Sequence, residues 1–202
     1  MNLLIIRHGQ SEADILKVFE GRADFPLTEL GLQQADKMAK WVTGYMKPDK
    51  IFASTLIRAR QTAEKLSAAT KIPIEFTDEL MEWNNGLIAG LPHAQALEKY
   101  PPPSQKHPHT ALYNQESEIE FRTRAEVVLS KIINENPPDA NIAIVSHGHM
   151  ITRLYRSFLC LPMVSNLSVY TADTGIHHWQ IEIDAPSNRK IVFANSTCHL
   201  RT

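Results

Sequence analysis

The chain alternates short apolar runs with longer segments in which apolar residues recur every three or four positions. The short runs are typical of strands buried on both faces, and the longer segments are typical of helices with one buried face. Four strands are expected, at residues 2–6, 50–53, 72–76 and 142–145. Four helices are expected, at residues 27–46, 55–69, 116–136 and 148–161.

This alternation predicts an α/β fold with a mostly parallel central sheet and helices on both faces. Residues 168–194 are expected to add further strands, with turns at 173–175 and 185–188. A length of 202 residues fits one domain. Residues 91–115 depart from the pattern because they hold five prolines. A long proline-rich excursion inside a compact domain is usually a lid, a binding loop or a disordered insert, and we expect a lid or specificity insertion here.

Composition narrows the classes of function. The net charge of −1 gives no overall basic field, so nucleic acid is not an expected partner. Two cysteines are too few for a disulfide framework or a zinc site. No leader-like or membrane-spanning apolar stretch is present in the sequence. We therefore expect a cytoplasmic protein without membrane contact, whose C-terminal edge strands could pair in a homodimer.

Chemically distinctive side chains follow each expected strand. Arg7 and His8 come directly after the first strand, and Arg58 lies in the first turn of the helix after the second. Glu82 follows the third strand, and His147 follows the fourth. Because ligands of such sheets bind beyond the carboxyl ends of the strands, these side chains are expected to share one site.

The residue types in this set suit a phosphoryl group. Arginine matches phosphate oxygens with two parallel N–H groups and stays charged, and helix N-termini add backbone N–H donors. A neutral imidazole can act as a nucleophile, and a carboxylate beside it can protonate the leaving oxygen. Phosphoryl transfer mainly demands positioning and charge neutralisation, which this set could supply without a metal.

Ordered blocks of sequence resemble the histidine phosphatase superfamily, which includes cofactor-dependent phosphoglycerate mutases. The resemblance implies a three-layer α/β sandwich and hydrolysis of a small phosphorylated substrate, with no metal and no cofactor. The blocks span nearly the whole chain in the family's order: residues 7–11 (RHGQS), 21–31 (GRADFPLTELG), 54–63 (STLIRARQTA), Glu82, 146–148 (SHG), and Asn195 with His199 and Leu200.

The resemblance also implies residue roles. His8 would be the nucleophile that becomes phosphohistidine. Glu82 would give a proton to the leaving group and then take one from the attacking water. The catalytic set is completed by Arg7, Arg58 and His147, which would hold the phosphoryl oxygens. The implied substrate-binding set is Arg7, Asp14, Glu20, Gly21, Arg58, His147 and Gly148.

Three positions depart from the family pattern. Asp14 stands where the family commonly has Asn, Glu20 where its phosphatases often have Gln, and Arg22 where Trp is usual. Ionised carboxylates in place of amides should weaken phosphate binding and select against small, highly charged phosphates. They should also raise the pKa of Glu82 by like-charge repulsion. Arg22 could pair with one of them.

Several alternatives stay open on the sequence. The protein could be a phosphatase or a mutase dependent on 2,3-bisphosphoglycerate. It could also be a module that only binds phospho-ligands or proteins and catalyses no reaction. The insertion has Lys99 and Lys106 as its basic residues besides histidines, which favours a phosphatase for less polar leaving groups. Glu79 could replace Glu82 as the acid. His147 and His149 lack a third ligand at suitable spacing, so a metal is not expected.

Overall fold

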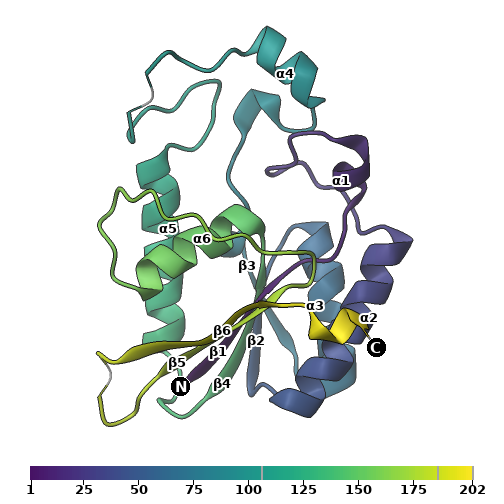
Figure 1. Ribbon diagram of the computed structural model, residues 1–202, viewed down its shortest axis with the longest axis vertical. Coiled ribbons are helices and arrows are strands. Elements are labelled where there is room, and N and C mark those ends of the chain that lie inside the picture. The colour runs from purple at the N-terminus through teal and green to yellow at the C-terminus, as the bar shows by residue number, and fades with distance from the viewer. Residues whose placement is uncertain (106, 186, 202) are drawn as a thin grey trace.

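The computed structural model describes residues 1–105, 107–185 and 187–201, and a six-stranded sheet forms the centre of this part of the chain (Figure 1). The strand order is β3-β2-β4-β1-β5-β6. The first four strands of this order run parallel, whereas β5 and β6 form an antiparallel hairpin at one edge. The predicted mostly parallel sheet is therefore confirmed. The strands are β1 (Asn2–Arg7), β2 (Lys50–Ser54), β3 (Ile74–Thr77), β4 (Asn141–Ser146), β5 (Ile176–Ile181) and β6 (Arg189–Ser196).

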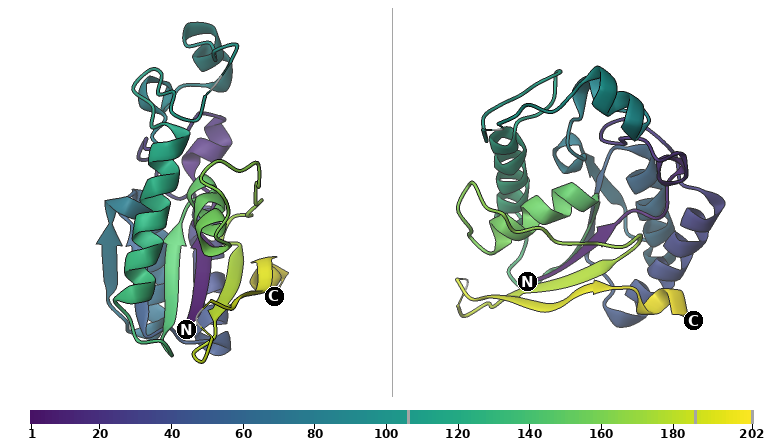
Figure 2. Two further views of the ribbon diagram at one scale, coloured as in Figure 1. Left: turned by 90° about the vertical axis from the view of Figure 1, so that its left-hand side faces the viewer. Right: turned by 45° about the horizontal axis from the view of Figure 1, so that its top comes forward.

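Helices cover both faces of the sheet (Figures 1 and 2). Helices α2 (Glu29–Tyr45) and α3 (Ile57–Thr70) lie on one face. Helices α5 (Glu118–Asn134) and α6 (Gly148–Phe158) lie on the other. This arrangement is the expected three-layer sandwich.

Strand β1 shows why its sequence is apolar without interruption. Leu3 and Ile5 pack into the core beneath α5 and α6, and Leu4 and Ile6 pack into the core beneath α2 and α3. Because successive side chains of a strand point to opposite faces, a strand covered on both sides needs an apolar residue at every position. The side chains of β4 are likewise divided between the two cores, so both central strands are covered on both faces.

Two short helices were not predicted. Helix α1 (Glu12–Leu16) has five residues, which is too short for a periodic apolar pattern to show. Helix α4 (His93–Lys99) begins directly after Pro92 and lies inside the proline-rich region, so that region is not wholly irregular. The boundaries of the four helices and four strands predicted by residue range differ from the observed ones by at most three residues. In the strand-like region predicted at 168–194, the first strand, β5, begins only at Ile176. None of the helices in the described ranges is long and apolar enough to cross a membrane.

The register of the parallel strands brings the chemically distinctive residues together. Arg7 at the end of β1 is opposite Ser146 at the end of β4. The next residues, His8 and His147, therefore leave the sheet side by side. Strand β2 lies on the far side of β4 and ends at Ser54, three residues before α3 begins.

Candidate active site

His8 and His147 form the centre of a buried cluster at the carboxyl edge of the sheet. Their ring centroids are 5.1 Å apart, and both side chains are almost completely buried. Arg58, in the first turn of α3, is fully buried beside them, and its Nε donates a hydrogen bond to His8 Nε2 over 3.3 Å. The structure thus brings together three residues that are 50 or more positions apart in the sequence.

The hydrogen bonds of His8 fix which ring nitrogen carries the proton. Nδ1 lies 2.7 Å from the carbonyl oxygen of Gly9, which can only accept, so Nδ1 is the protonated nitrogen. Nε2 consequently keeps its lone pair. Burial, and then the charge of Arg58, lower the pKa of His8 well below its ordinary value of 6.5. His8 is therefore a neutral imidazole at neutral pH, and its unprotonated Nε2 accepts a hydrogen bond from Arg58.

Gly9 contributes through its small size. A Cβ atom at this position would lie 2.5 Å from the carbonyl oxygen of Gly31 at the start of α2. The loop that carries His8 therefore packs directly on the backbone of that helix. Gly9 thus packs closely against Gly31 of the same chain. This packing fixes the Gly9 carbonyl, which orients the His8 ring.

The guanidinium of Arg58 is held by backbone carbonyls on its outer side. Nη2 donates to the carbonyl of Gly21 over 2.8 Å, and Nη1 donates to that of Ala23 over 3.1 Å. Gly21 has a φ of 51°, a left-handed conformation that glycine adopts readily. Gly21 therefore shapes the loop that orients Arg58, and it also lines the cavity described below.

Arg7 is anchored by a different loop. Its Nη1 donates to the carbonyl of Thr171 over 2.8 Å and lies 3.4 Å from Asp173 Oδ1. Its Nη2 lies 3.7 Å from Asp14 Oδ1. Thr171 and Asp173 were not singled out from the sequence. A backbone acceptor such as Thr171 leaves no side-chain signal that could have found it.

His147 presents an unused hydrogen-bond donor. Its Nε2 lies 2.8 Å from Ser54 Oγ, and the same hydroxyl accepts the N–H of Leu56, so the hydroxyl proton is free to point at His147. The proton of His147 then resides on Nδ1, a buried atom with no hydrogen-bond partner. Burial, and then Arg58, lower the pKa of His147 well below 6.5.

Glu82 sits at the N-terminus of α6. Its Oε2 accepts the backbone N–H of His149 over 3.0 Å, and its Oε1 accepts those of Met150 and Trp83 over 3.1 and 2.8 Å. Burial alone would raise the pKa of Glu82, but the hydrogen bond and charge of His149 and the other donors hold it well below its ordinary 4.5. The expectation that Asp14 and Glu20 raise this pKa is therefore wrong, because the helix N-terminus and His149 dominate.

Glu20 and Asp14, the two carboxylates at positions where amides are expected, lie in different parts of the structure. Glu20 lines the cavity, with Oε2 3.2 Å from Arg58 Nε and 3.9 Å from His8 Nε2. Burial raises the pKa of Glu20, against the opposing effect of Arg58. Asp14 accepts the backbone N–H and hydroxyl of Ser11 at the start of α1, behind Arg7. Arg22 pairs with Glu116, at 3.8 Å, rather than with either of them.

One cavity of about 460 Å³ lies above the carboxyl edge of the sheet, and its lining residues include Arg7, His8, Glu20, Gly21 and Glu82 but not Asp14, Arg58 or His147. Glu20 and Glu82 both line it, whereas Glu79 lines a separate hollow with Phe52 and Phe76, so Glu79 is not a carboxylate of this cavity. The described part of the chain contains no group of three or more metal-ligating side chains. The residues lining the cavity are Arg7, His8, Val18, Phe19, Glu20, Gly21, Glu82, Asn85, His93, Gly148, His149, Thr152, Ser168, Val169, Tyr170 and Thr171.

A buried neutral imidazole flanked by arginines at this edge of a parallel sheet defines an enzyme that transfers phosphoryl groups. The chain belongs to the histidine phosphatase superfamily, branch 1, whose model matches residues 3–192. Members of this family act through a phosphohistidine, and the chain is a histidine phosphatase.

Relatives of known sequence are named phosphatases. A glucosyl-3-phosphoglycerate phosphatase of Mycobacterium tuberculosis is 30% identical over 81% of this chain and 77% of its own length. A broad-specificity phosphatase of Saccharomyces cerevisiae is 32% identical over 75% of this chain and 67% of its own length. An adenosylcobalamin/alpha-ribazole phosphatase of Salmonella typhimurium is 29% identical over 82% of this chain and 83% of its own length.

Solved structures share the fold along nearly the whole chain. The native structure of mycobacterial glucosyl-3-phosphoglycerate phosphatase superposes with a TM-score of 0.83 at 25% identity, covering 96% of this chain and 98% of the other. The alpha-ribazole phosphatase of Shigella flexneri gives a TM-score of 0.84 at 22% identity, covering 98% and 97%. The latter likeness concerns the fold alone.

Proposed function

We propose that the cavity hydrolyses phosphomonoesters with His8 as the nucleophile and Glu82 as the group that moves the proton. One observation carries this assignment. His8, whose unprotonated Nε2 accepts a hydrogen bond from Arg58, lines the same cavity as Arg7, and the ring of His147 lies 5.1 Å from that of His8.

The binding step uses three groups around His8. Arg7, which lines the cavity, and Arg58, which contacts His8, would neutralise the charge of the phosphoryl oxygens, and the unpartnered Nδ1–H of His147 would give one oxygen a neutral donor. Gly148 lines the same cavity, and no atom lies within 4 Å of where its Cβ would be. A side chain at residue 148 would reduce the space for the phosphoryl group.

In the first chemical step, Nε2 of His8 forms a bond to phosphorus as the bond to the leaving oxygen breaks. The leaving oxygen takes its proton from Glu82. Free Glu82 is a carboxylate, so it must gain a proton before this step. A phosphoryl dianion placed beside it disfavours the ionised form and thus raises its pKa when the substrate binds.

In the second step, a water molecule attacks the phosphohistidine and gives a proton to Glu82. The phosphorus–nitrogen bond breaks, its electron pair returns to Nε2, and inorganic phosphate leaves. The carbonyl of Gly9 holds the Nδ1 proton throughout, so the same nitrogen of His8 serves every turnover. This cycle requires no metal and no cofactor.

A mutase reaction is less well supported by the surroundings of the cavity. A sugar-acid substrate needs cations for its carboxylate, yet Arg7 is the only Lys or Arg among the described residues lining the cavity. Lys99, in the insertion, has its ammonium 5.4 Å from the ring of Tyr100. Lys106 lies outside the described residues.

We also propose a cytoplasmic location and a homodimer. The free, exposed thiols of Cys160 and Cys198 suit a compartment that keeps cysteines reduced. Strand β6 is an edge strand that exposes Ile191 and Val192, so it offers a surface for strand pairing. Light scattering after size exclusion, with Val192→Lys as the comparison, measures the oligomeric state.

The decisive experiment is a phosphate-release assay over a panel of phosphomonoesters, with and without EDTA and 2,3-bisphosphoglycerate. We expect steady hydrolysis that is unchanged by EDTA, does not require bisphosphoglycerate and is lost in His8→Ala. Isomerisation of a phosphorylated sugar acid that depends on bisphosphoglycerate would support the mutase instead. No phosphate release from any ester would leave only a binding function.

A further inference from the structure

We propose that an apolar cavity within the insertion is a second subsite, which takes the apolar end of the leaving group. The preferred substrates would then be phosphomonoesters of alkyl or aryl alcohols. This inference rests on the proposed function, because it concerns the leaving group of the same reaction.

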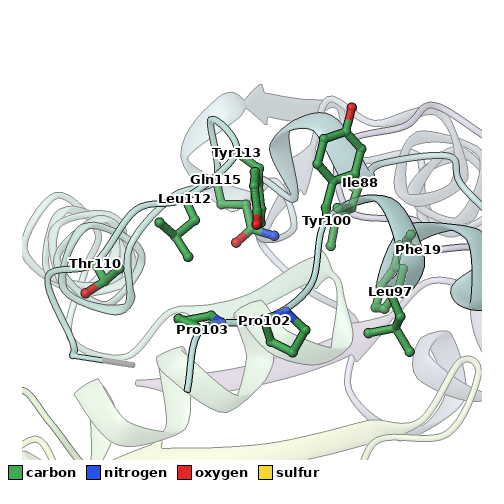
Figure 3. A pocket seen from close by; sticks show the side chains of 11 residues that line it. Phe19, Ile88, Leu97, Tyr100, Pro102, Pro103, Thr110, Leu112, Tyr113 and Gln115 are labelled. Carbon is green, nitrogen blue, oxygen red and sulfur yellow. The ribbon is translucent and has the colours of Figure 1, made fainter. Parts of the chain in front are cut away.

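The cavity has a volume of about 180 Å³ and is distinct from the cavity lined by His8 and Glu82, which we call the phosphate cavity. Figure 3 shows the side chains that line the apolar cavity. None of the described residues that line it is charged. Most of its lining residues come from α4, from the segment that follows α4 and from the loop that follows α1. The residues that matter for the argument are Phe19, Ala96, Leu97, Tyr100, Leu112 and Tyr113. A concave apolar surface of this kind is typical of a small-molecule subsite.

The walls of this cavity are held in place by specific contacts. The hydroxyl of Tyr113 donates to the carbonyl of Pro101 over 3.1 Å, and its ring lies 5.0 Å from that of Tyr100. The carbonyl of Tyr113 accepts the N–H of Leu87 over 2.8 Å. Tyr113 and Asn114 both have positive φ angles, which non-glycine residues rarely adopt. The cavity is therefore built into the fold of the insertion.

Phe19 connects this cavity with the phosphate cavity, because its side chain lines both. Its backbone is tied to the start of the insertion: Phe19 N–H donates to the carbonyl of Leu91 over 2.9 Å, and its carbonyl accepts the N–H of Gly90 over 2.7 Å. The ring of Phe19 also lies 4.5 Å from the ring of His93, which lines the phosphate cavity. The two cavities thus share one fixed aromatic wall.

The lining changes from charged in the phosphate cavity to apolar in the second cavity. This change matches a phosphomonoester with an apolar leaving group. Arg7, His8 and Glu82 line the phosphate cavity alone, whereas Phe19 lines both cavities. A leaving group that extends from the phosphoryl group past Phe19 would move from a charged site to an apolar one. Burial of its methylenes there would increase binding.

Alkyl phosphates from methyl to octyl test this proposal, because their alcohols have nearly the same acidity and differ mainly in apolar length. We expect kcat/KM to rise by up to about fourfold per methylene until the cavity is filled. Ala96→Leu fills the cavity and should remove this rise, while methyl phosphate is hydrolysed as before. Ala94→Leu is the matched control, because Ala94 lies exposed on the same helix and lines neither cavity.

Leu97→Asp is a second variant, which protects the test against a folding defect. Leu97 is 53% exposed, so an aspartate there is compatible with the fold, yet it places a charge at the cavity wall. It should also flatten the dependence on chain length. Equal kcat/KM from methyl to octyl phosphate, or equal effects of Ala94→Leu and Ala96→Leu, would overturn the subsite and leave the phosphatase proposal intact. Failure to hydrolyse any ester would overturn both.

Discussion

The Glu20 carboxylate lies 3.2 Å from the Nε atom of Arg58, on the side of the guanidinium that faces the His8 nucleophile. An ionised Glu20 therefore competes with the phosphoryl group for Arg58. Glu20→Gln should raise kcat/KM for a dianionic phosphomonoester by about tenfold, since a pair of charges a few ångströms apart near a protein surface is worth on the order of 1–4 kcal/mol. The gain should grow as pH rises and Glu20 ionises. Steady-state kinetics between pH 5 and 8 measure it.

Asp14→Asn is the comparison for this variant. Asp14 is bonded to Ser11 and lies behind Arg7, so its replacement should change stability more than substrate ranking. If both variants keep the parent's kcat/KM and the parent's ranking of phosphomonoesters, neither carboxylate selects the substrate.

Arg58→Lys should lower kcat/KM by about 10²–10³, the effect of losing one donor to a developing negative charge. A lysine has a single ammonium, which cannot bond the carbonyls of Gly21 and Ala23 and also reach the phosphoryl group. Arg60→Lys is the control, because Arg60 is exposed and lies over the ring of Phe76 on the outer side of α3. Equal activity of the two variants would remove Arg58 from the proposed site.

Side chains and backbone atoms differ in how far the sequence could predict the site. His8 and His147 were predictable because two apolar strands deliver them, and parallel register brings strand ends together. The carbonyl of Thr171, which orients Arg7, carries no side-chain signal. The low pKa of Glu82 depends on the His149 side chain and on backbone N–H groups, two of them at the start of α6, whose direction only the folded backbone defines. Short α1 and α4 lack enough turns for periodicity to be seen.

Glu82→Gln should slow turnover of alkyl phosphates by about 10²–10⁴, the usual contribution of a proton donor. An ester of a more acidic phenol needs less help in the first step, so its phosphohistidine should form and then persist. Rapid-quench experiments with 4-nitrophenyl phosphate should show a burst of nitrophenol and a phosphorylated His8. Glu79→Gln provides the matched control and should behave like the parent. A burst in the parent and none in Glu82→Gln would contradict the assigned role.

His177 links the stability of the fold to the position of Arg7. Its Nδ1 accepts the N–H of Asn195 over 3.1 Å, and its Nε2 lies 3.0 Å from the hydroxyl of Thr171, the residue whose carbonyl holds Arg7. Burial lowers the pKa of His177 to about 4. Below pH 6.5 the unfolded chain therefore binds a proton that the folded chain does not, and stability falls as pH drops toward 4.

This residue's share of the loss should reach about 3 kcal/mol over that interval. Urea unfolding of the parent and of His177→Gln at pH 7.5 and at pH 5 measures it, because the glutamine removes the titrating group. We expect a smaller difference between the two pH values in the variant, whatever its absolute stability. Parallel pH dependences in the two proteins would show that another group controls acid unfolding.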